Sequence, residues 1–334
     1  ATLTDLDCEP LPGVHLGHRH IPVQAVGSYS PGGRYPLIAS ALMTVVTPRV
    51  AGVERIVAVA PPRPGVGGIH PAQLYAMLTA GADEIVCLGG VQALAALAYG
   101  LADLEPVDLI VGAGNAYVAE AKRRLFGDVG IDLLAGPTEI LVLADESADP
   151  RLVAADLLGQ AEHGPTSPAA LVTDSERFGR AVIDAVEQWL GTWPTADVAG
   201  RAWRDHGEVV VCDDREEMAA TADRYAPEHL ELQTADDDWF LARLRNYGTI
   251  FVGAGSTVAY SDKAIGTNHV LPTRRAARYT GGLWVGKFLK TVTYQRVDPS
   301  AAATIAHHTA TICDAESMAG HALTARLRME QPVA

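Results

Sequence analysis

The stretch that decides the fold class is EIVCLGGVQALAALAYG, residues 84–100. Its first part, residues 84–90, is a short apolar run of the kind that forms a buried β-strand. Its second part, residues 91–100, carries apolar residues at helical spacing and closes on a glycine. A strand followed directly by a helix is the start of a crossover to a parallel neighbouring strand. The stretch therefore predicts one βα unit.

The same pattern recurs on both sides of this unit. Further apolar, β-branched runs occur at residues 55–62, 107–114, 139–145, 169–174, 208–214 and 248–255. The helical stretches between them cover residues 71–81, 115–127, 150–163, 176–191 and 215–225. Repeated βα units predict mostly parallel sheets with helices on both faces. We therefore predict an α/β fold that contains two Rossmann-like units.

Composition limits the class of protein. The chain has 334 residues, 48% of them hydrophobic, which is enough for one large or two ordinary domains with sizeable cores. A formal charge of −14 argues against a nucleic-acid or anionic-membrane partner, because phosphate contacts need clustered Lys and Arg. No apolar run approaches the ~20 residues of a membrane span, and the start of the chain lacks a secretory signal pattern. We expect a cytoplasmic protein that acts on a small molecule.

The cysteines predict neither a disulfide framework nor a thiolate metal site. Cys8, Cys87, Cys212 and Cys313 are far apart, and no C-x-x-C pair occurs. Such spacing is typical of reduced thiols in a cytoplasmic protein.

Glycine-rich turns stand where two of the strands are expected to end. They are GGVQ, residues 89–92, and GAGN, residues 112–115. In an open α/β sheet the ligand crevice lies beyond the carboxyl ends of the strands, where such turns let phosphates approach the backbone. Neither turn is a G-x-G-x-x-G fingerprint with an acidic residue about 20 positions on. Taken alone, they can equally be tight turns that bind nothing.

A helix with ligand-type side chains ends in DLLGQAEHGPTSP, residues 156–168. Gly164 and Pro165 mark its C-terminus, because glycine tolerates the left-handed cap and proline cannot continue the hydrogen-bond ladder. Gln160 and His163 lie three residues apart, so their side chains project from one face and can converge on one point. The alternative is that both side chains only bond the last carbonyl groups of the helix.

Three more places offer side chains suited to metal binding or proton transfer. They are Glu228 with His229, Asp262 with His269, and Glu316 with His321. Asp262 and His269 lie in residues 256–295, a long stretch without clear periodicity, and such segments in compact domains are usually functional or disordered. Nitrogen and oxygen ligands without thiolate suit Zn²⁺ or Mn²⁺. Spacing alone does not show that these side chains converge.

The chain resembles the histidinol dehydrogenase family over nearly its whole length. The blocks that carry the resemblance are, in order, YSPGG, GGVQAL, GAGNAYVAEAK, GPTEILVLAD, DLLGQAEHG, PEHL, GTNHVLPT, FLKTVT and GHALTARLR. So many blocks in the same order make the resemblance specific. It implies a zinc- and NAD-dependent enzyme that oxidises a primary alcohol through an aldehyde to a carboxylate, with two hydride transfers to NAD⁺.

The resemblance also implies a role for individual residues. The zinc ligands are Gln160, His163, Asp262 and, in a domain-swapped homodimer with shared sites, His321 of the partner subunit. NAD contacts fall on Tyr29, Gln92 and Asn115. Substrate contacts fall on Thr138, which stands where the family usually has Ser, on His269, and on Glu316 of the partner subunit.

Glu228 and His229 match the acid-base pair of the family. A histidine, whose ordinary pKa is about 6.5, suits removal of the alcohol proton, and the neighbouring carboxylate can activate the water that attacks the aldehyde. Zinc would orient the substrate and polarise its oxygen. If both residues lay inside one strand, however, their side chains would point to opposite faces of the sheet.

The predicted domain boundaries follow the same resemblance. Residues 1–24 and 139–222 form a first Rossmann-like unit with a shortened N-terminal segment, because the family carries a long helical segment before YSPGG. Residues 25–138 and 223–285 form a second unit that binds NAD, and residues 286–334 form a helical tail that reaches the partner subunit. Glu316 and His321 are five residues apart, about 140° around a helix, so one helix would present them on different sides.

The chain departs from the family pattern after GTNHVLPT. It continues RRAARYTGGLWVGK where the family usually has an uncharged run, and this adds Arg274, Arg275 and Arg278. Guanidinium groups match sulfonate or carboxylate oxygens, whereas histidinol is cationic. The block looks like the sulfopropanediol dehydrogenase paralogues, and it favours an anionic diol such as 2,3-dihydroxypropane-1-sulfonate as substrate.

Two alternatives stay open at this point. The arginines can instead pair with surface carboxylates, which leaves histidinol as the substrate. The chain can also be a non-catalytic binding or assembly paralogue, because its glycine turns are non-standard and its N-terminal segment is shortened.

Overall fold

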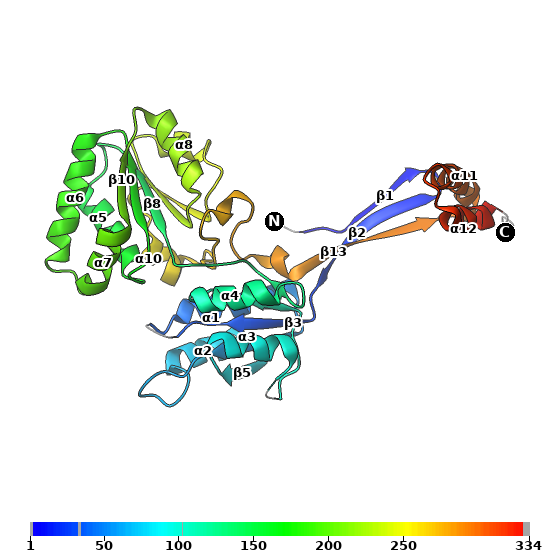
Figure 1. Cartoon of the computed structure of the whole chain (residues 1–334), viewed down its shortest axis with the longest axis horizontal. Helices are drawn as coiled ribbons and strands as arrows, with labels where there is room; N and C mark the ends of the chain where they lie inside the picture. Colours follow the sequence, from blue (N-terminus) through cyan, green and yellow to red (C-terminus); the bar gives the residue numbers. More distant parts are fainter. Residues whose placement is uncertain (1–2, 33–34, 102, 330–334) are drawn as a thin grey trace. The chain divides into compact units, whose positions relative to one another are not determined.

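The computed structural model describes residues 3–32, 35–101 and 103–329, which form two units. We call the unit Val23–Phe288 the body. We call the other unit, which combines the chain up to Pro22 with the chain from Leu289, the arm. The body contains both parallel sheets, and the arm contains an antiparallel sheet and two helices (Figure 1).

The first parallel sheet of the body has the strand order β5-β4-β3-β6-β7. Its strands are β3 (Ala25–Tyr29), β4 (Arg55–Ala60), β5 (Glu84–Cys87), β6 (Leu109–Val111) and β7 (Gly130–Ile131). The connecting helices are α1 (Ile38–Ala51), α2 (Pro71–Ala80), α3 (Gly90–Tyr99) and α4 (Ala116–Leu125). Helices α1 and α2 pack together, as do α3 and α4, so each pair covers one face of the sheet.

The second parallel sheet repeats this topology with the order β10-β9-β8-β11-β12. Its strands are β8 (Ile140–Ala144), β9 (Ala169–Thr173), β10 (Gly207–Val211), β11 (His229–Gln233) and β12 (Thr249–Val252). The helices are α5 (Pro150–Ala161), α6 (Glu176–Leu190), α7 (Ala196–His206), α8 (Arg215–Tyr225) and α9 (Asp237–Leu241). In each sheet the strand order reverses beside the first strand, where α/β proteins open a ligand crevice.

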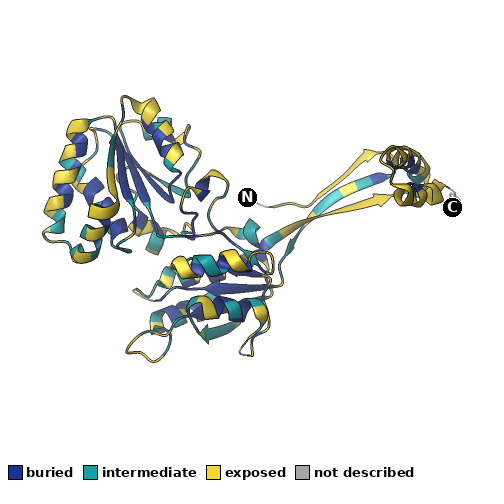
Figure 2. Ribbon diagram, viewed as in Figure 1, coloured by how far each residue is buried: buried dark blue, intermediate teal, exposed yellow. Residues whose placement is uncertain are grey.

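Burial explains why the strands of both parallel sheets are continuous apolar runs in the sequence. β4, β8, β9 and β11 are buried along almost their whole length, because helices cover both faces of each sheet. Separate apolar clusters fill the two sides of the second sheet, one beneath α5 and α6 and the other beneath α8. Figure 2 shows these strands as buried and the outward helix faces as exposed. The predicted α/β fold with two Rossmann-like sheets is confirmed.

The segment after β12 is irregular, as its lack of periodicity predicts. It contains the short helix α10 (Val258–Tyr260), a π-helical turn η1 (Ser261–Ile265), and two 3₁₀ turns, η2 (Ala276–Arg278) and η3 (Val285–Phe288). Turns of this kind are common where a chain is shaped for function rather than for core packing.

The arm is a three-stranded antiparallel sheet joined to a helix pair. Its strands are β1 (Leu6–Leu11), β2 (Val14–Pro22) and β13 (Leu289–Val297), in the order β1-β2-β13. The helices α11 (Pro299–Ala315) and α12 (Ala319–Met329) pack on each other. The C-terminal helical tail predicted for residues 286–334 is therefore helical only from Pro299, because Leu289–Val297 forms β13. Within the described residues, no helix is long and apolar enough to cross a membrane.

The strand pairing differs from the predicted unit boundaries. Those boundaries group residues 223–285 with 25–138, whereas β11 and β12 extend the sheet of β8. They also group residues 1–24 with 139–222, whereas β2 pairs with β13 along nine residues. Pairing joins backbone groups of segments far apart in the chain, so local sequence patterns do not specify the partner strand.

Candidate functional site

The predicted acid-base pair lies where two neighbouring strands begin. Thr138 and Glu139 precede β8, and Glu228 directly precedes β11, whose first residue is His229. The Glu228 Oε2 atom accepts hydrogen bonds from the Thr138 hydroxyl at 2.5 Å and from the Glu139 amide at 3.0 Å. Because Glu228 stands outside the strand, strand alternation does not separate it from His229. Its Oε2 atom lies 3.4 Å from His229 Nδ1.

His229 is buried, and its two ring nitrogens face different partners. Nδ1 lies 3.0 Å from the Glu139 carbonyl oxygen, and Nε2 lies 3.3 Å from Nδ1 of His269. A neutral ring that donates from Nδ1 to this carbonyl keeps a lone pair on Nε2. Burial lowers the pKa of His229, but the charge and hydrogen bond of Glu228 outweigh burial and raise the pKa above its ordinary value.

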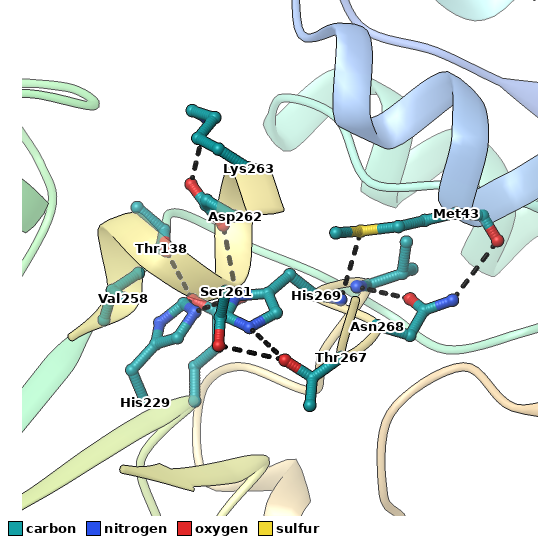
Figure 3. Close-up of polar contacts among 12 residues, drawn as sticks. Met43, Thr138, His229, Val258, Ser261, Asp262, Lys263, Thr267, Asn268 and His269 are labelled. Atoms are coloured by element: carbon teal, nitrogen blue, oxygen red, sulfur yellow. Dashed lines mark hydrogen bonds and ion pairs between the residues drawn. The ribbon is translucent and has the colours of Figure 1, made fainter. Parts of the chain in front are cut away.

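His269 connects His229 to Asp262. The Asp262 Oδ1 atom lies 3.1 Å from His269 Nδ1, and Met43 of α1 accepts a hydrogen bond from the His269 backbone amide at 3.2 Å. Figure 3 shows Asp262, His269 and His229 in one chain of polar contacts. Burial acts to raise the pKa of Asp262, but the hydrogen bond from His269, with the nearby cationic groups, lowers it to about 2. Asp262 is therefore a carboxylate.

The end of α5 supplies the other two predicted ligands from this chain. Gln160 is buried and its Nε2 atom donates to the Thr138 hydroxyl, whereas His163 follows the helix by two residues. Burial lowers the pKa of the His163 ring, and the charge of Asp262 acts in the opposite direction. Among the described residues, no side chain or backbone group hydrogen-bonds the His163 ring nitrogens or Gln160 Oε1. These atoms remain available as ligands.

These residues do not form a complete metal site by themselves. Within the described residues, no group of three or more His, Cys, Asp or Glu side chains is placed to hold a metal ion. His163 and Asp262 provide one nitrogen and one carboxylate ligand, and Gln160 provides a weaker amide oxygen. The donor types fit zinc, and the set needs a further ligand.

Glu139 is a site residue that the sequence analysis did not single out. Its backbone carbonyl contacts His229, and its Oε1 atom accepts the Arg274 amide at 3.1 Å. Burial, followed by the charge of Glu228, raises the pKa of Glu139 to about 7. The only sequence signal is a charged residue at the start of a buried strand, next to Thr138.

The predicted NAD-contacting residues gather at the carboxyl edge of the first sheet. Tyr29 ends β3, Asn115 caps α4 directly after the β6 turn, and Gln92 lies in the first turn of α3 after β5. The Tyr29 hydroxyl accepts a hydrogen bond from the Gly90 amide at 3.2 Å. Gly112 has φ +113°, and a Cβ there would lie 2.1 Å from the Tyr29 carbonyl oxygen, so only glycine fits.

A buried ion pair holds the turn that follows β6. The Lys122 ammonium bonds the Asp132 carboxylate and also donates to the Gly112 carbonyl at 2.9 Å. Asp132 in turn accepts the Gly112 amide at 2.7 Å. Both side chains are at most 2% exposed. The pair thereby fixes both backbone groups of Gly112, in the turn predicted to receive the cofactor.

Of the three arginines, Arg274 is tied to the acid-base pair by a hydrogen bond to Glu139. The Arg274 amide binds Glu139, and Thr273 accepts the Gly136 amide at 2.6 Å. Arg274 and Arg275 have φ +54° and +65°, a left-handed conformation that costs a non-glycine residue about 1 kcal/mol or more. All three arginine side chains are exposed, and none forms an ion pair with a residue that the structure describes.

The two predicted contributions of the tail lie in the arm. Glu316 caps α11, Ser317 has φ +60°, and His321 lies in α12. The two side chains are exposed and belong to separate helices, so the tail is not one continuous helix. Their expected role opposite a partner's site stays a prediction.

Comparisons with known proteins assign the chain to a family. The family model described as histidinol dehydrogenase matches residues 3–329. A histidinol dehydrogenase homolog of Mesorhizobium japonicum is 56% identical over 99% of this chain and 66% of its own length. A sulfopropanediol 3-dehydrogenase of Ruegeria pomeroyi is 54% identical over 98% of this chain and 76% of its own length.

A solved structure extends this likeness to the fold. Histidinol dehydrogenase of Elizabethkingia anophelis superposes with a TM-score of 0.92 at 34% identity, over 98% of this chain and 76% of that chain. The relatives thus include a named histidinol dehydrogenase and a named sulfopropanediol 3-dehydrogenase at substantial identity. The chain belongs to the histidinol dehydrogenase family.

Proposed function

We propose that this protein is a zinc- and NAD-dependent dehydrogenase that oxidises an anionic primary alcohol to a carboxylate in two hydride transfers. Family members are NAD-dependent dehydrogenases, and one relative is a sulfopropanediol 3-dehydrogenase. The observation that carries the proposal is the buried Glu228–His229 pair beside the ligand-type side chains of His163 and Asp262. Such a constellation combines a base, an acid and metal ligands in one place.

The residues of this chain account for the proton transfers. His229 Nε2, with its lone pair, would take the proton of the substrate hydroxyl while the hydride leaves. The aldehyde product must gain water before a second hydride can leave. Glu228, held by the Thr138 hydroxyl and the Glu139 amide, would take a proton from that water. Bound NAD⁺ would accept each hydride.

Zinc would be held by His163, Asp262 and Gln160 of this chain. When bound, it would orient the substrate and polarise its oxygen. The unclaimed ring nitrogens of His163 and the low pKa of Asp262 support this assignment, since zinc ligands must be deprotonated.

The arginines favour an anionic substrate. The alternative that they neutralise surface carboxylates has no support among the described residues, because none of the three forms an ion pair there. Arg274 is tied to Glu139 through its backbone, which places it nearest the acid-base pair in the hydrogen-bond network. Two consecutive left-handed arginines also indicate a backbone shaped for a specific contact.

Substitution of Arg274, Arg275 or Arg278 by alanine tests this substrate class. Removal of the arginine that holds the anionic group should lower kcat/KM for 2,3-dihydroxypropane-1-sulfonate by about tenfold to over a hundredfold, because a charge-assisted contact is lost. The loss should fall mainly on KM. A neutral diol of the same shape should be unaffected, and cationic histidinol should improve. NAD⁺-linked absorbance measures all three reactions.

Arg245→Ala is the matched control, since Arg245 is an exposed arginine elsewhere in the body. Equal small losses on the three substrates would show that the arginines are structural, and histidinol would then be the preferred substrate. Absence of NAD⁺ reduction with every alcohol would favour a non-catalytic binding or assembly paralogue.

The exposed apolar surface of the arm supports a homodimer with shared sites. Leu6, Leu11, Ile312, Leu323 and Leu327 are each more than half exposed. β1 and nearly all of β13 are exposed as well, and such a sheet buries too little surface to stabilise itself. A second copy that covers the arm would supply His321 of the partner subunit as the missing zinc ligand and Glu316 of the partner subunit as a substrate contact.

Mixing H321A chains with D262A chains tests the shared site. In a mixed dimer one of the two sites would retain both Asp262 and His321, so each mixed dimer should have about half of the wild-type activity, and a 1:1 mixture after random exchange about a quarter. Each homodimer should remain inactive. Subunit exchange is checked by native mass spectrometry. If mixed dimers form and no activity returns, the tail serves its own subunit.

A further inference from the structure

A buried carboxyl pair lies away from the acid-base pair, between α5 and β11. Glu231, in the middle of β11, is 1% exposed. Asp156, midway along α5, accepts hydrogen bonds from the Gln233 amide and the Thr257 hydroxyl, both at 3.0 Å. Glu231 Oε1 accepts the Val258 backbone amide at 3.2 Å, whereas Glu231 Oε2 has no described donor.

The two carboxyl groups lie side by side, because the consecutive residues Thr257 and Val258 bind Asp156 and Glu231 respectively, and Gln233 of β11 also binds Asp156. Two such groups can hydrogen-bond to each other only if one carries a proton, because carboxylates are acceptors only. Both oxygens of Asp156 already accept from other donors, so the proton belongs on Glu231, whose Oε2 atom then donates to Asp156. Burial, followed by the charge of Asp156, raises the pKa of Glu231 well above its ordinary value. The groups that face the pair are the Gln233 amide, the Thr257 hydroxyl and the Val258 amide.

The pair joins three segments that carry site residues at their ends. Glu231 is two residues from His229 along β11, and Asp156 is one helical turn from Gln160 along α5. Val258 begins α10, four residues before Asp262. None of these three segments is connected to another by a short loop, so a tertiary contact must hold them in register.

We propose that Glu231 is a positioning residue whose carboxyl group, joined to Asp156 by one shared proton, holds β11, α5 and α10 together. The pair thereby sets the relative placement of His229, Gln160 and Asp262. The effect on catalysis rests on the function proposed above, whereas the effect on stability does not. Loss of the shared proton leaves two carboxylates facing each other in a buried place, and each then opposes the folded state.

The raised pKa of Glu231 determines whether the folded protein gains or loses stability as the pH rises. A glutamate whose pKa is higher in the folded than in the unfolded chain stabilises the fold at low pH. This contribution decreases as the pH rises above the ordinary value of 4.5 and is lost once the pH passes the folded pKa. The melting temperature of the wild-type protein should therefore fall across that range.

E231Q separates the shared proton from the shape of the side chain. Glutamine keeps the volume and donates an N–H group to Asp156 at every pH, so the melting temperature of E231Q should fall less between about pH 6 and about pH 9. At neutral pH, E231Q should keep kcat/KM within about threefold of wild type. E231A removes the bond and should lose about tenfold or more in kcat/KM, mainly in kcat.

E187Q provides the matched control, because Glu187 is an exposed glutamate on α6. Its substitution should leave the pH dependence of the melting temperature and kcat/KM unchanged. The proposal is overturned if E231Q and wild type show parallel melting curves with pH, or if E231A keeps wild-type kcat/KM. The melting curves need no substrate. If the melting curves of E231Q and wild type differ as expected but no alcohol is turned over, the shared proton between Glu231 and Asp156 would be supported. The proposed function would then be overturned.

Discussion

Replacement of His229 by asparagine is expected to lower kcat about 100- to 10,000-fold, the usual contribution of a positioned general base. Asparagine retains a polar group that can donate to the Glu139 carbonyl, but it offers no basic nitrogen in place of Nε2. The substrate hydroxyl would then have to lose its proton to water. KM should change little, because the lost interaction acts in the transition state. Steady-state NAD⁺ reduction with the preferred diol measures the effect.

Two further variants make this expectation specific. H206N changes an exposed histidine at the end of α7 and should leave kcat unchanged. E228Q removes the carboxylate next to His229, and it should impair the aldehyde step more than the alcohol step, since only the aldehyde requires water. Supplying the aldehyde directly separates the two steps. A kcat of H229N within tenfold of wild type would show that another group takes the alcohol proton.

Replacement of Asp262 by alanine is expected to abolish zinc binding, from about one zinc per chain to less than a tenth. The substitution removes the proposed carboxylate ligand and leaves His163 and the amide of Gln160 as the proposed ligands from this chain. It also removes the partner of His269 Nδ1, so the ring loses its orientation against His229. Elemental analysis of protein passed over a chelating column gives the zinc content without any assay of activity.

D184A is the control for this experiment, because Asp184 is an exposed carboxylate on α6. Alanine at that helical position should leave folding and zinc content unchanged. Circular dichroism of D262A establishes that the body is folded. Full zinc occupancy in a folded D262A protein would exclude Asp262 from the metal site, whatever the activity of the variant.

Several elements were predictable because their causes are local. The apolar run of residues 84–90 and the helical spacing of residues 91–100 correspond to β5 and α3, since each pattern reflects a strand or helix buried on a sheet. The end of α5 was predictable to within two residues from Gly164 and Pro165, but the helix ends at Ala161 with Glu162 as its cap, so His163 lies just beyond the last turn. Asn115 as the cap of α4 has the same local origin: its side chain bonds the amides of the first helical turn.

Other features of the site had no local signal. In the sequence, Glu139 is only the start of an apolar strand. Its pKa is raised to about 7 by burial and by the charge of Glu228, which lies 89 residues further along the chain, and both causes arise only in the folded chain. The strand β2 shows a similar dependence, because its partner β13 follows it by more than 250 residues. Sequence patterns report whether a segment is buried, but not which distant segment buries it.

The sequence by itself determined the α/β class, most strand and helix positions, and, through its ordered blocks, the family and the candidate site residues. Periodicity and turn chemistry act within a few residues, so these features can be read without coordinates. Only the tertiary structure decided the strand order of each sheet, the pairing of both chain ends in the arm, and the contacts that join Glu228, His229, His269 and Asp262. Those features depend on hydrogen bonds and charges between distant segments, whose energies exist only once the chain has brought the segments together.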